Sequence, residues 1–211
     1  MSHVLKRLAL ALLLFLLVYA PAFALVAWLH SSVELTIPLI IAVSACVAAI
    51  CMALLAKPPQ GAREFGLARS RRSFIFAAAI AGVIIGLAFA YIAARYPAHS
   101  PLDLSKLPPW MIIVYFVIAA PIQEELIFRG LLQSLVSRGA SSRTFCAIHF
   151  PVFFIAALFG IIHVDSGIVI ATEAVLLGLI AGEFRRMSGS LIPAILFHAL
   201  LNAVSALWPS A

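Results

Sequence analysis

The sequence contains a series of apolar runs, each about 20 residues long, separated by short polar or proline-containing segments. The hydrocarbon core of a bilayer is about 30 Å thick, and an α-helix needs roughly 20 residues to cross it. Of the 211 residues, 64% are hydrophobic and only 10% are charged, which is more apolar surface than a soluble domain needs. We therefore expect an all-α fold, a polytopic transmembrane helical bundle in which residues 1–211 form a single domain.

The apolar runs predict about seven spans. Ala22-Phe23-Ala24 in the first run resembles a signal-peptide cleavage site, but the run continues to Leu29 and is longer than the roughly 7 to 15 apolar residues of a signal peptide. We interpret it as a retained signal anchor. The spans lie at about 8–29, 36–56, 73–94, 110–136, 145–164, 167–184 and 190–208. Two pairs of glycines four residues apart, which favour close helix packing, are Gly82 with Gly86 and Gly178 with Gly182.

The formal net charge of +6 is explained by the distribution of basic residues among the loops. Basic residues concentrate in cytoplasmic loops of membrane proteins. With the N-terminus cytoplasmic and the C-terminus outside, only Arg95 and Lys106 fall outside, so no nucleic-acid partner is needed. The residues on the cytoplasmic side are Lys6, Arg7, Lys57, Arg63, Arg69, Arg71, Arg72, Arg138, Arg143, Arg185 and Arg186.

The fourth span carries three ionisable residues, Glu124, Glu125 and Arg129. Each costs about 2.5 to 3.5 kcal/mol at the centre of a membrane helix, so such residues are usually paired or functional. Glu125 and Arg129 are four residues apart and lie on one helix face, which favours an ion pair. Around the helix axis, Glu124 points about 100° away from Glu125, and it has no partner on its own helix. A free carboxylate of this kind is a candidate general base.

Two further spans carry polar groups that suit the same site. His163 ends the fifth span, and His198 and Asn202 share one face of the seventh. At 1.5 Å of rise per residue from the cytoplasmic arginines, Glu124, His198 and Asn202 lie at roughly 18 to 24 Å depth. His163 comes out at roughly 30 Å unless the fifth helix starts late, for which Pro151 gives a reason.

The ordered motifs EExxxR (Glu124 to Arg129), FxxxH (Phe159 to His163) and HxxxN (His198 to Asn202) resemble those of the CAAX protease and bacteriocin-processing family of intramembrane glutamic endopeptidases, which includes the Ras-converting CAAX endopeptidases. The resemblance covers about residues 110–205, which would be the catalytic core. It implies an intramembrane endopeptidase.

The resemblance implies roles for individual residues. Glu124 would activate water with help from His163, while His198 and Asn202 would form the oxyanion hole. Glu125, Arg129 and Phe159 would support the site, and Phe159 with Phe128 would wall its cavity. The substrate would be a membrane-anchored or lipidated protein or peptide in the lipid bilayer. The protein itself would be an integral protein of the bacterial inner (plasma) membrane.

No cofactor is expected, and zinc is the second choice. One glutamate and two histidines can bind catalytic zinc, but the sequence lacks an HExxH helix motif, and Asn202 is a better hydrogen-bond donor than zinc ligand. Cys46, Cys51 and Cys146 have no paired spacing that indicates a disulfide framework or a thiolate metal site.

Some polar residues remain outside these motifs. Asp165 is expected at the outer interface, with a histidine-orienting role as the alternative, and His149 is expected to be interfacial. Glu173 could be protonated, paired with a histidine, or part of the substrate cavity, and the sequence does not choose. His3, His30 and His99 are expected to be solvated.

Two functions from other classes fit the same composition. Buried carboxylates and histidines also form proton relays, so a proton- or ion-coupled transporter is one alternative. The other is a noncatalytic membrane immunity or assembly factor that retains the fold.

Overall fold

The computed structural model describes residues 3–30, 32–58, 60–95, 107–140, 144–145 and 148–208. The predicted positions His99, Lys106, Arg143 and Cys146 lie outside these ranges. The described residues form seven helices, and the predicted all-helical fold is confirmed. The helices are α1 (His3–Leu29), α2 (Val33–Leu55), α3 (Arg72–Ala93), a long helix over Pro109–Gly139, α7 (Phe150–Ile161), α8 (Ile168–Ser188) and α9 (Ile192–Leu207).

Two 3₁₀ turns and two short strands complete the described structure. A 3₁₀ turn, Gly61–Phe65, lies in the basic loop, and another, Val164–Ser166, follows α7. Two-residue strands β1 (Thr144–Phe145) and β2 (Ile148–His149) pair antiparallel, Thr144 with His149 and Phe145 with Ile148. This small hairpin was not predicted, and it occupies residues that the sequence assigned to the start of the fifth span.

The long helix is irregular on both sides of the two glutamates. It consists of α4 (Pro109–Ile112), a π-helical stretch Ile113–Ala119, α5 (Ala120–Glu125), a second π-helical stretch Leu126–Leu132, and α6 (Gln133–Ala140). Pro121 lies just after the first π-helical stretch. A proline removes a backbone donor and clashes with the preceding turn, so a wider turn accommodates it. Glu124 and Glu125 thus lie on one short α-helical segment between two wide ones.

Large apolar side chains cover the outside of the bundle. Leu54, Phe76 and Ile168 are exposed by 81%, 68% and 76% respectively. Exposing so many large apolar side chains to water is unfavourable, whereas contact with lipid chains is not. Four helices are long and apolar enough to cross a membrane: α1, α2 from Glu34, α3 and the Pro109–Gly139 helix. These four helices suggest an integral membrane protein.

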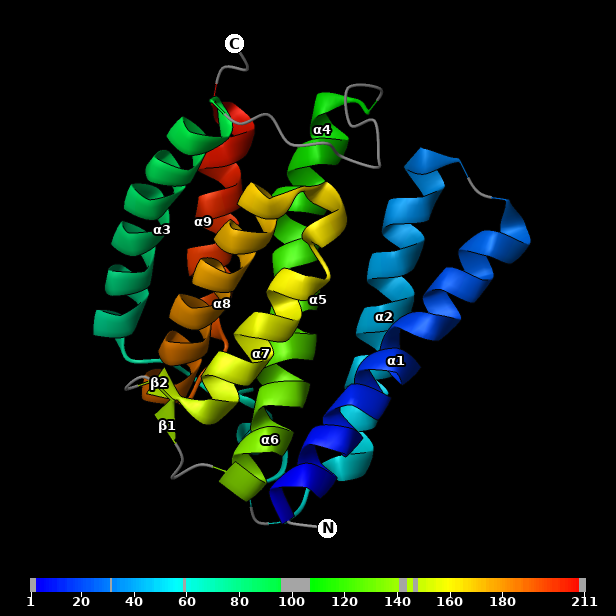
Figure 1. The fold of residues 1–211 in the computed structure, drawn as a ribbon, viewed down its shortest axis with the longest axis vertical. Coiled ribbons are helices and arrows are strands. Elements are labelled where there is room, and N and C mark those ends of the chain that lie inside the picture. The colour runs from blue at the N-terminus through cyan, green and yellow to red at the C-terminus, as the bar shows by residue number, and fades with distance from the viewer. Residues whose placement is uncertain are drawn as a thin grey trace.

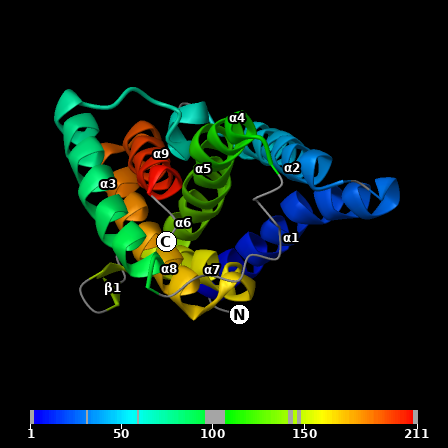
Figure 2. The ribbon, with the colours of Figure 1, turned by 90° about the horizontal axis from the view of Figure 1, so that it is seen from above.

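Glycines let the helices pack closely. A Cβ on Gly82 would lie 2.8 Å from the Phe197 carbonyl oxygen, and one on Gly178 would lie 2.9 Å from Ala156 Cα. Gly82 and Gly86 thus bring α3 against α9, and Gly178 and Gly182 bring α8 against α7, which confirms the predicted packing role. Seen from above, α3, α7, α8 and α9 surround one side of the long helix, and α1 and α2 extend from the other (Figure 2).

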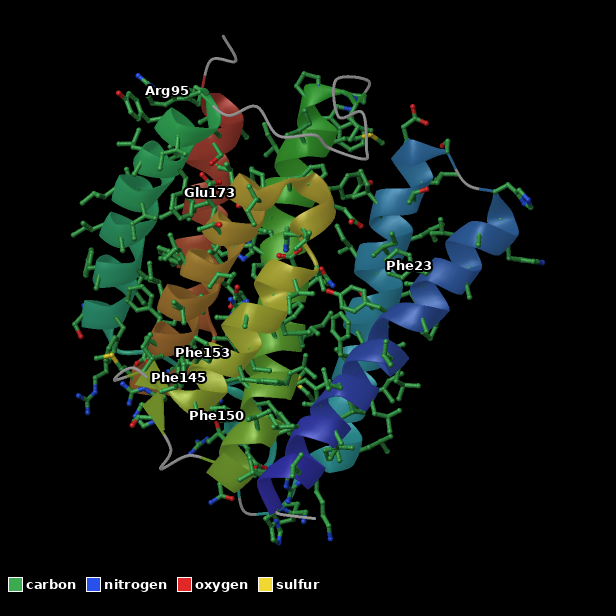
Figure 3. All side chains as sticks on the ribbon, viewed as in Figure 1. Phe23, Arg95, Phe145, Phe150, Phe153 and Glu173 are labelled. Carbon is green, nitrogen blue, oxygen red and sulfur yellow. The ribbon has the colours of Figure 1, made fainter. Side chains whose placement is uncertain are left out.

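The two ends of the bundle differ in charge. The N-terminus lies at the lower end of Figure 1 and the C-terminus at the upper end. The C-terminal ends of α6 and α8, with Arg138, Arg185 and Arg186, lie at the lower end, whereas Arg95 lies at the upper end (Figures 1 and 3). Phe145, Phe150 and Phe153 gather near the lower end (Figure 3). The predicted orientation, with the N-terminus cytoplasmic, requires basic residues to lie mainly at the end of the bundle that holds the N-terminus, as these do. The orientation itself stays a prediction.

The fifth helix is shorter than the sequence predicted. α7 begins at Phe150, with Pro151 in its first turn, and has 12 residues, while α9 has 16. At 1.5 Å per residue these helices are about 18 and 24 Å long, less than the hydrocarbon core. Because α7 starts late, His163 lies only about 20 Å along the chain from Phe150, and the depth of His163 in the membrane stays a prediction. The number of complete membrane crossings stays a prediction.

Candidate active site

Glu125 and Arg129 form the predicted ion pair at the centre of the protein. Arg129 Nη1 lies 3.0 Å from Glu125 Oε1, and both side chains are 0% exposed. The Arg129 guanidinium also lies over the Phe159 ring, 4.8 Å from its centroid. A buried ion pair needs a second set of contacts to offset desolvation, and the Phe159 ring supplies one of them.

His198 on α9 connects this pair to Glu124. Its Nδ1 lies 3.0 Å from Glu125 Oε1, so the Nδ1–H donates to a carboxylate that Arg129 already holds in place. Its Nε2 lies 3.7 Å from Glu124 Oε2. That distance is longer than a hydrogen bond and leaves an oxygen atom of a reactant room to contact both groups. Glu124 is 20% exposed, unlike Glu125, and is the accessible carboxylate of the two.

Asn202 lies one turn further along α9 and contacts the long helix. Its Nδ2 donates to the Phe116 carbonyl oxygen over 2.8 Å. In the π-helical stretch the N–H of Ala120 donates to the carbonyl oxygen of Tyr115, five residues back. By the same spacing, the carbonyl oxygen of Phe116 would accept from the backbone nitrogen of Pro121. Proline has no N–H, and Asn202 supplies the missing donor. This bond uses one of the two amide hydrogens of Asn202 and leaves the other.

His163 lies at the end of α7, beside the Phe159 ring. Its Nδ1 is 2.7 Å from the Phe159 carbonyl oxygen, and the two ring centroids are 4.6 Å apart. Because a carbonyl oxygen only accepts, Nδ1 carries the hydrogen and Nε2 is left as the proton acceptor of the neutral ring. The Phe159 ring also meets His198 edge-on at 6.1 Å, so both imidazoles lie beside the same aromatic ring.

The structure brings most of the predicted site residues together, but Glu124 contacts His198 rather than the predicted His163. Glu124, Glu125, His198 and Arg129 form one chain of contacts, and Asn202 adjoins it on α9. Within the described residues, the polar contact of Glu124 is with His198, and no hydrogen bond or ion pair joins Glu124 to His163. Phe128 and Phe159 form an edge-to-face pair with ring centroids 4.8 Å apart, and their role as a cavity wall stays a prediction.

Three polar residues of this region were not singled out from the sequence. Gln123 Nε2 donates to the Tyr19 hydroxyl oxygen over 3.1 Å and to Ser44 Oγ over 3.0 Å. These bonds fasten α1 and α2 to the helix that carries Glu124. The available signal was the cost of a glutamine inside an apolar span, which requires partners on neighbouring helices.

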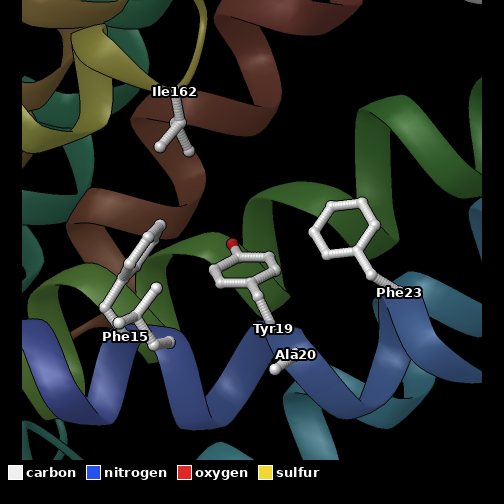
Figure 4. A pocket seen from close by; sticks show the side chains of 6 residues that line it. Phe15, Tyr19, Ala20, Phe23 and Ile162 are labelled. Atoms are coloured by element: carbon white, nitrogen blue, oxygen red, sulfur yellow. The ribbon is translucent and has the colours of Figure 1, made fainter.

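An apolar pocket opens between α1 and the end of α7. It has a volume of about 320 Å³ and is lined by Phe15, Leu16, Tyr19, Ala20, Phe23 and Ile162. Figure 4 shows the α1 side chains on one side and Ile162 on the other. Ile162 precedes His163, and Tyr19 bonds to the neighbour of Glu124, so the pocket adjoins the polar site.

The remaining predicted residues lie at the edges. Asp165 is exposed in the turn after α7, as expected for an interfacial residue, and His149 is half-buried in β2. Glu173 on α8 is half-buried, and its Oε1 is buried without a hydrogen-bond partner. No histidine within the described ranges pairs with Glu173. His3 and His30 are exposed, as predicted.

A metal centre needs at least three side chains that can bind a metal ion close together. Among the residues that the structure describes, no three His, Cys, Asp or Glu side chains converge closely enough to hold a metal ion. Cys46 is exposed and Cys51 is buried, and both are free thiols.

The helices and the site together define a class, a helical membrane protein with a carboxylate, imidazole and amide site beside an apolar pocket. Residues 106–204 match the family described as type II CAAX prenyl endopeptidase Rce1-like. This part of the chain belongs to that family, which is a family of peptidases, and the resemblance stated from the motifs is confirmed. No curated protein and no solved structure matches the chain.

Proposed function

We propose that this protein is an intramembrane endopeptidase in which Glu124 acts as general base on the attacking water. The observation that carries the proposal is the chain of contacts from Arg129 through Glu125 and His198 to Glu124. Residues 110–205 form the catalytic core in this proposal, and the bacterial inner (plasma) membrane is its location.

The chemistry follows from the hydrogen-bond roles. Glu125 accepts the Nδ1–H of His198 and holds the ring with Nε2 toward Glu124, so that, when His198 carries a hydrogen on both ring nitrogens, Nε2–H donates to the oxyanion of the tetrahedral intermediate. The free amide hydrogen of Asn202 is the second donor. Glu124 removes a proton from the water as its oxygen attacks the peptide carbonyl carbon, and His163, whose Nε2 is a proton acceptor, assists it. When the C–N bond of the tetrahedral intermediate breaks, the protonated Glu124 gives this proton to the leaving amine nitrogen.

The substrate is a membrane-anchored or lipidated protein or peptide, in line with the prenyl endopeptidase description of the family. The lipid chain occupies the apolar pocket beside Tyr19 and Ile162, because this pocket adjoins the polar site and has an apolar lining. The peptide bond then lies over Glu124 and His198 while the lipid stays out of water.

The test is cleavage of a farnesylated peptide by the purified full chain, followed by mass spectrometry of the products. Glu124→Gln keeps the side-chain shape but removes the base, so we expect a fall in kcat of at least about 10³-fold. The matched control is Glu183→Gln, which changes a partly exposed carboxylate that pairs with Arg186 on α8. The control should cleave at the normal rate.

His163→Ala and Asn202→Ala test the other roles, and each should lower kcat by about 10²-fold or more. Near-normal cleavage by the Glu124 variant, with correct folding, would show that the base is another group. Loss of wild-type activity on chelation and its return with zinc would replace the metal-free mechanism by a zinc mechanism.

A further inference from the structure

A second, polar cavity lies at the basic end of the bundle. It has a volume of about 330 Å³, several times the roughly 30 Å³ that one water molecule occupies. Its polar lining comes from the 3₁₀ turn after α2, from the long helix and from the end of α8. The charged residues and the amide in this lining are Glu64, Arg129, Gln133, Arg138, Arg185 and Arg186.

Positive charge exceeds negative charge around this cavity. Three of its arginines have carboxylate partners, since Arg129 pairs with Glu125, Arg138 with Glu64 and Arg186 with Glu183. Arg185 has no carboxylate within ion-pair distance among the described residues. It donates instead to the Glu64 carbonyl oxygen over 2.9 Å and contacts Ser134 Oγ at 3.4 Å. One full positive charge is therefore left without an acidic partner.

Several guanidinium donors in this lining are unused. Nε and Nη2 of Arg129, which is 0% exposed, are buried without a hydrogen-bond partner, and so is Nε of Arg185. Buried donors without partners are costly and rare in native proteins. These donors are packed against neighbouring helices, whereas Arg185 itself lines the cavity, so an anion bound in the cavity would offset its unpaired charge.

We propose that this cavity binds a phosphate-class oxyanion. Guanidinium groups match the geometry of phosphate oxygens and remain charged at all relevant pH values. The cavity lies at the end of the bundle where the sequence predicts the cytoplasmic leaflet, whose anionic headgroups favour basic pockets between helices. The phosphate comes from an anionic lipid headgroup or from solution, and the experiment below separates the two sources.

The experiment measures thermal unfolding of the purified full chain in nonionic detergent by tryptophan fluorescence. Phosphatidylglycerol is compared with zwitterionic phosphatidylcholine, and sodium phosphate with sodium chloride at equal ionic strength. At about 100 times the dissociation constant, the Tm should rise by on the order of 5 °C. A rise with phosphatidylglycerol alone identifies a headgroup site, and a rise with both ligands identifies a site that accepts free phosphate. No rise with either ligand overturns the proposal.

Two variants test the location. Arg185→Gln should lose most of the rise, whereas Arg72→Gln should keep it, because Arg72 is exposed at the start of α3 and outside the cavity. Ser137→Asp places a carboxylate in the cavity lining, so it should lose the rise without lowering the Tm of the unliganded protein. This variant decides the question if Arg185→Gln fails to fold. A full response in Ser137→Asp contradicts the assignment.

The anion site does not depend on the proposed catalysis. Glu124 does not line this cavity, so Glu124→Gln should respond to phosphatidylglycerol as the wild type does. The failure of either proposal thus leaves the other standing.

Discussion

Removal of Arg129 should be among the most destabilising single changes in this protein. Arg129→Met keeps an unbranched side chain of similar length but leaves Glu125 as a fully buried carboxylate. Glu125 Oε2 already lacks a hydrogen-bond partner, so His198 would be the remaining partner of this charge. An uncompensated buried charge costs about 3 to 5 kcal/mol.

The double variant Glu125→Gln with Arg129→Met separates the charge effect from the loss of packing. The substituted amide at this position would be neutral, and its side-chain oxygen could still accept from His198. The cation–π contact with Phe159 is lost in both variants and contributes up to about 2 kcal/mol. We therefore expect the double variant to lose no more than about 2 kcal/mol, and so to be more stable than Arg129→Met.

The assay is equilibrium unfolding in mixed micelles of increasing sodium dodecyl sulfate content. The four proteins compared are the wild type, Glu125→Gln, Arg129→Met and the double variant. Arg186→Met is the matched control, because it breaks an ion pair whose side chains are 40% and 31% exposed. Such pairs contribute roughly 0 to 1 kcal/mol. A loss of less than about 1 kcal/mol in Arg129→Met, or a double variant less stable than Arg129→Met, would refute the assignment of this cost to an uncompensated buried charge.

Two further predictions concern the apolar pocket and the helix packing. Ala20→Trp fills the pocket from an exposed position on α1, so it should raise KM for a farnesylated peptide about tenfold or more and leave kcat nearly unchanged; an unchanged KM would place the lipid elsewhere. Gly178→Val puts a branched side chain 2.9 Å from Ala156 Cα and should lower the free energy of unfolding by about 1 to 3 kcal/mol. The control is Ala77→Val at an exposed position on α3, which should change the free energy of unfolding by less than about 0.5 kcal/mol, and equal losses in the two variants would argue against close packing of α7 and α8.

The sequence alone determined the features that depend on local interactions. Hydropathy over about 20 residues located the helices to within about five residues, and the largest differences are at the start of α1, which begins at His3 rather than 8, and of α7, which begins at Phe150 rather than 145. The Glu125–Arg129 pair could be predicted because both residues belong to one helix and are one turn apart. The ordered motifs indicated the peptidase family, and the match over 106–204 confirms it.

Only the tertiary structure decided which helix faces meet. The spacing of a helix shows that His198 and Asn202 share a face, but not that the face meets Glu125 and the Phe116 carbonyl group. The bond between Gln123 and Tyr19 joins residues 104 positions apart, and no local pattern indicates it.

The basic cavity likewise required the tertiary structure. Arg138 and Arg185 were recognised as topology signals, but the cavity that they share with Arg129 exists only because the ends of α6 and α8 meet the turn at Glu64. Helix formation is decided within a few turns of the chain, whereas the partners of a buried charge are decided by packing among all the helices.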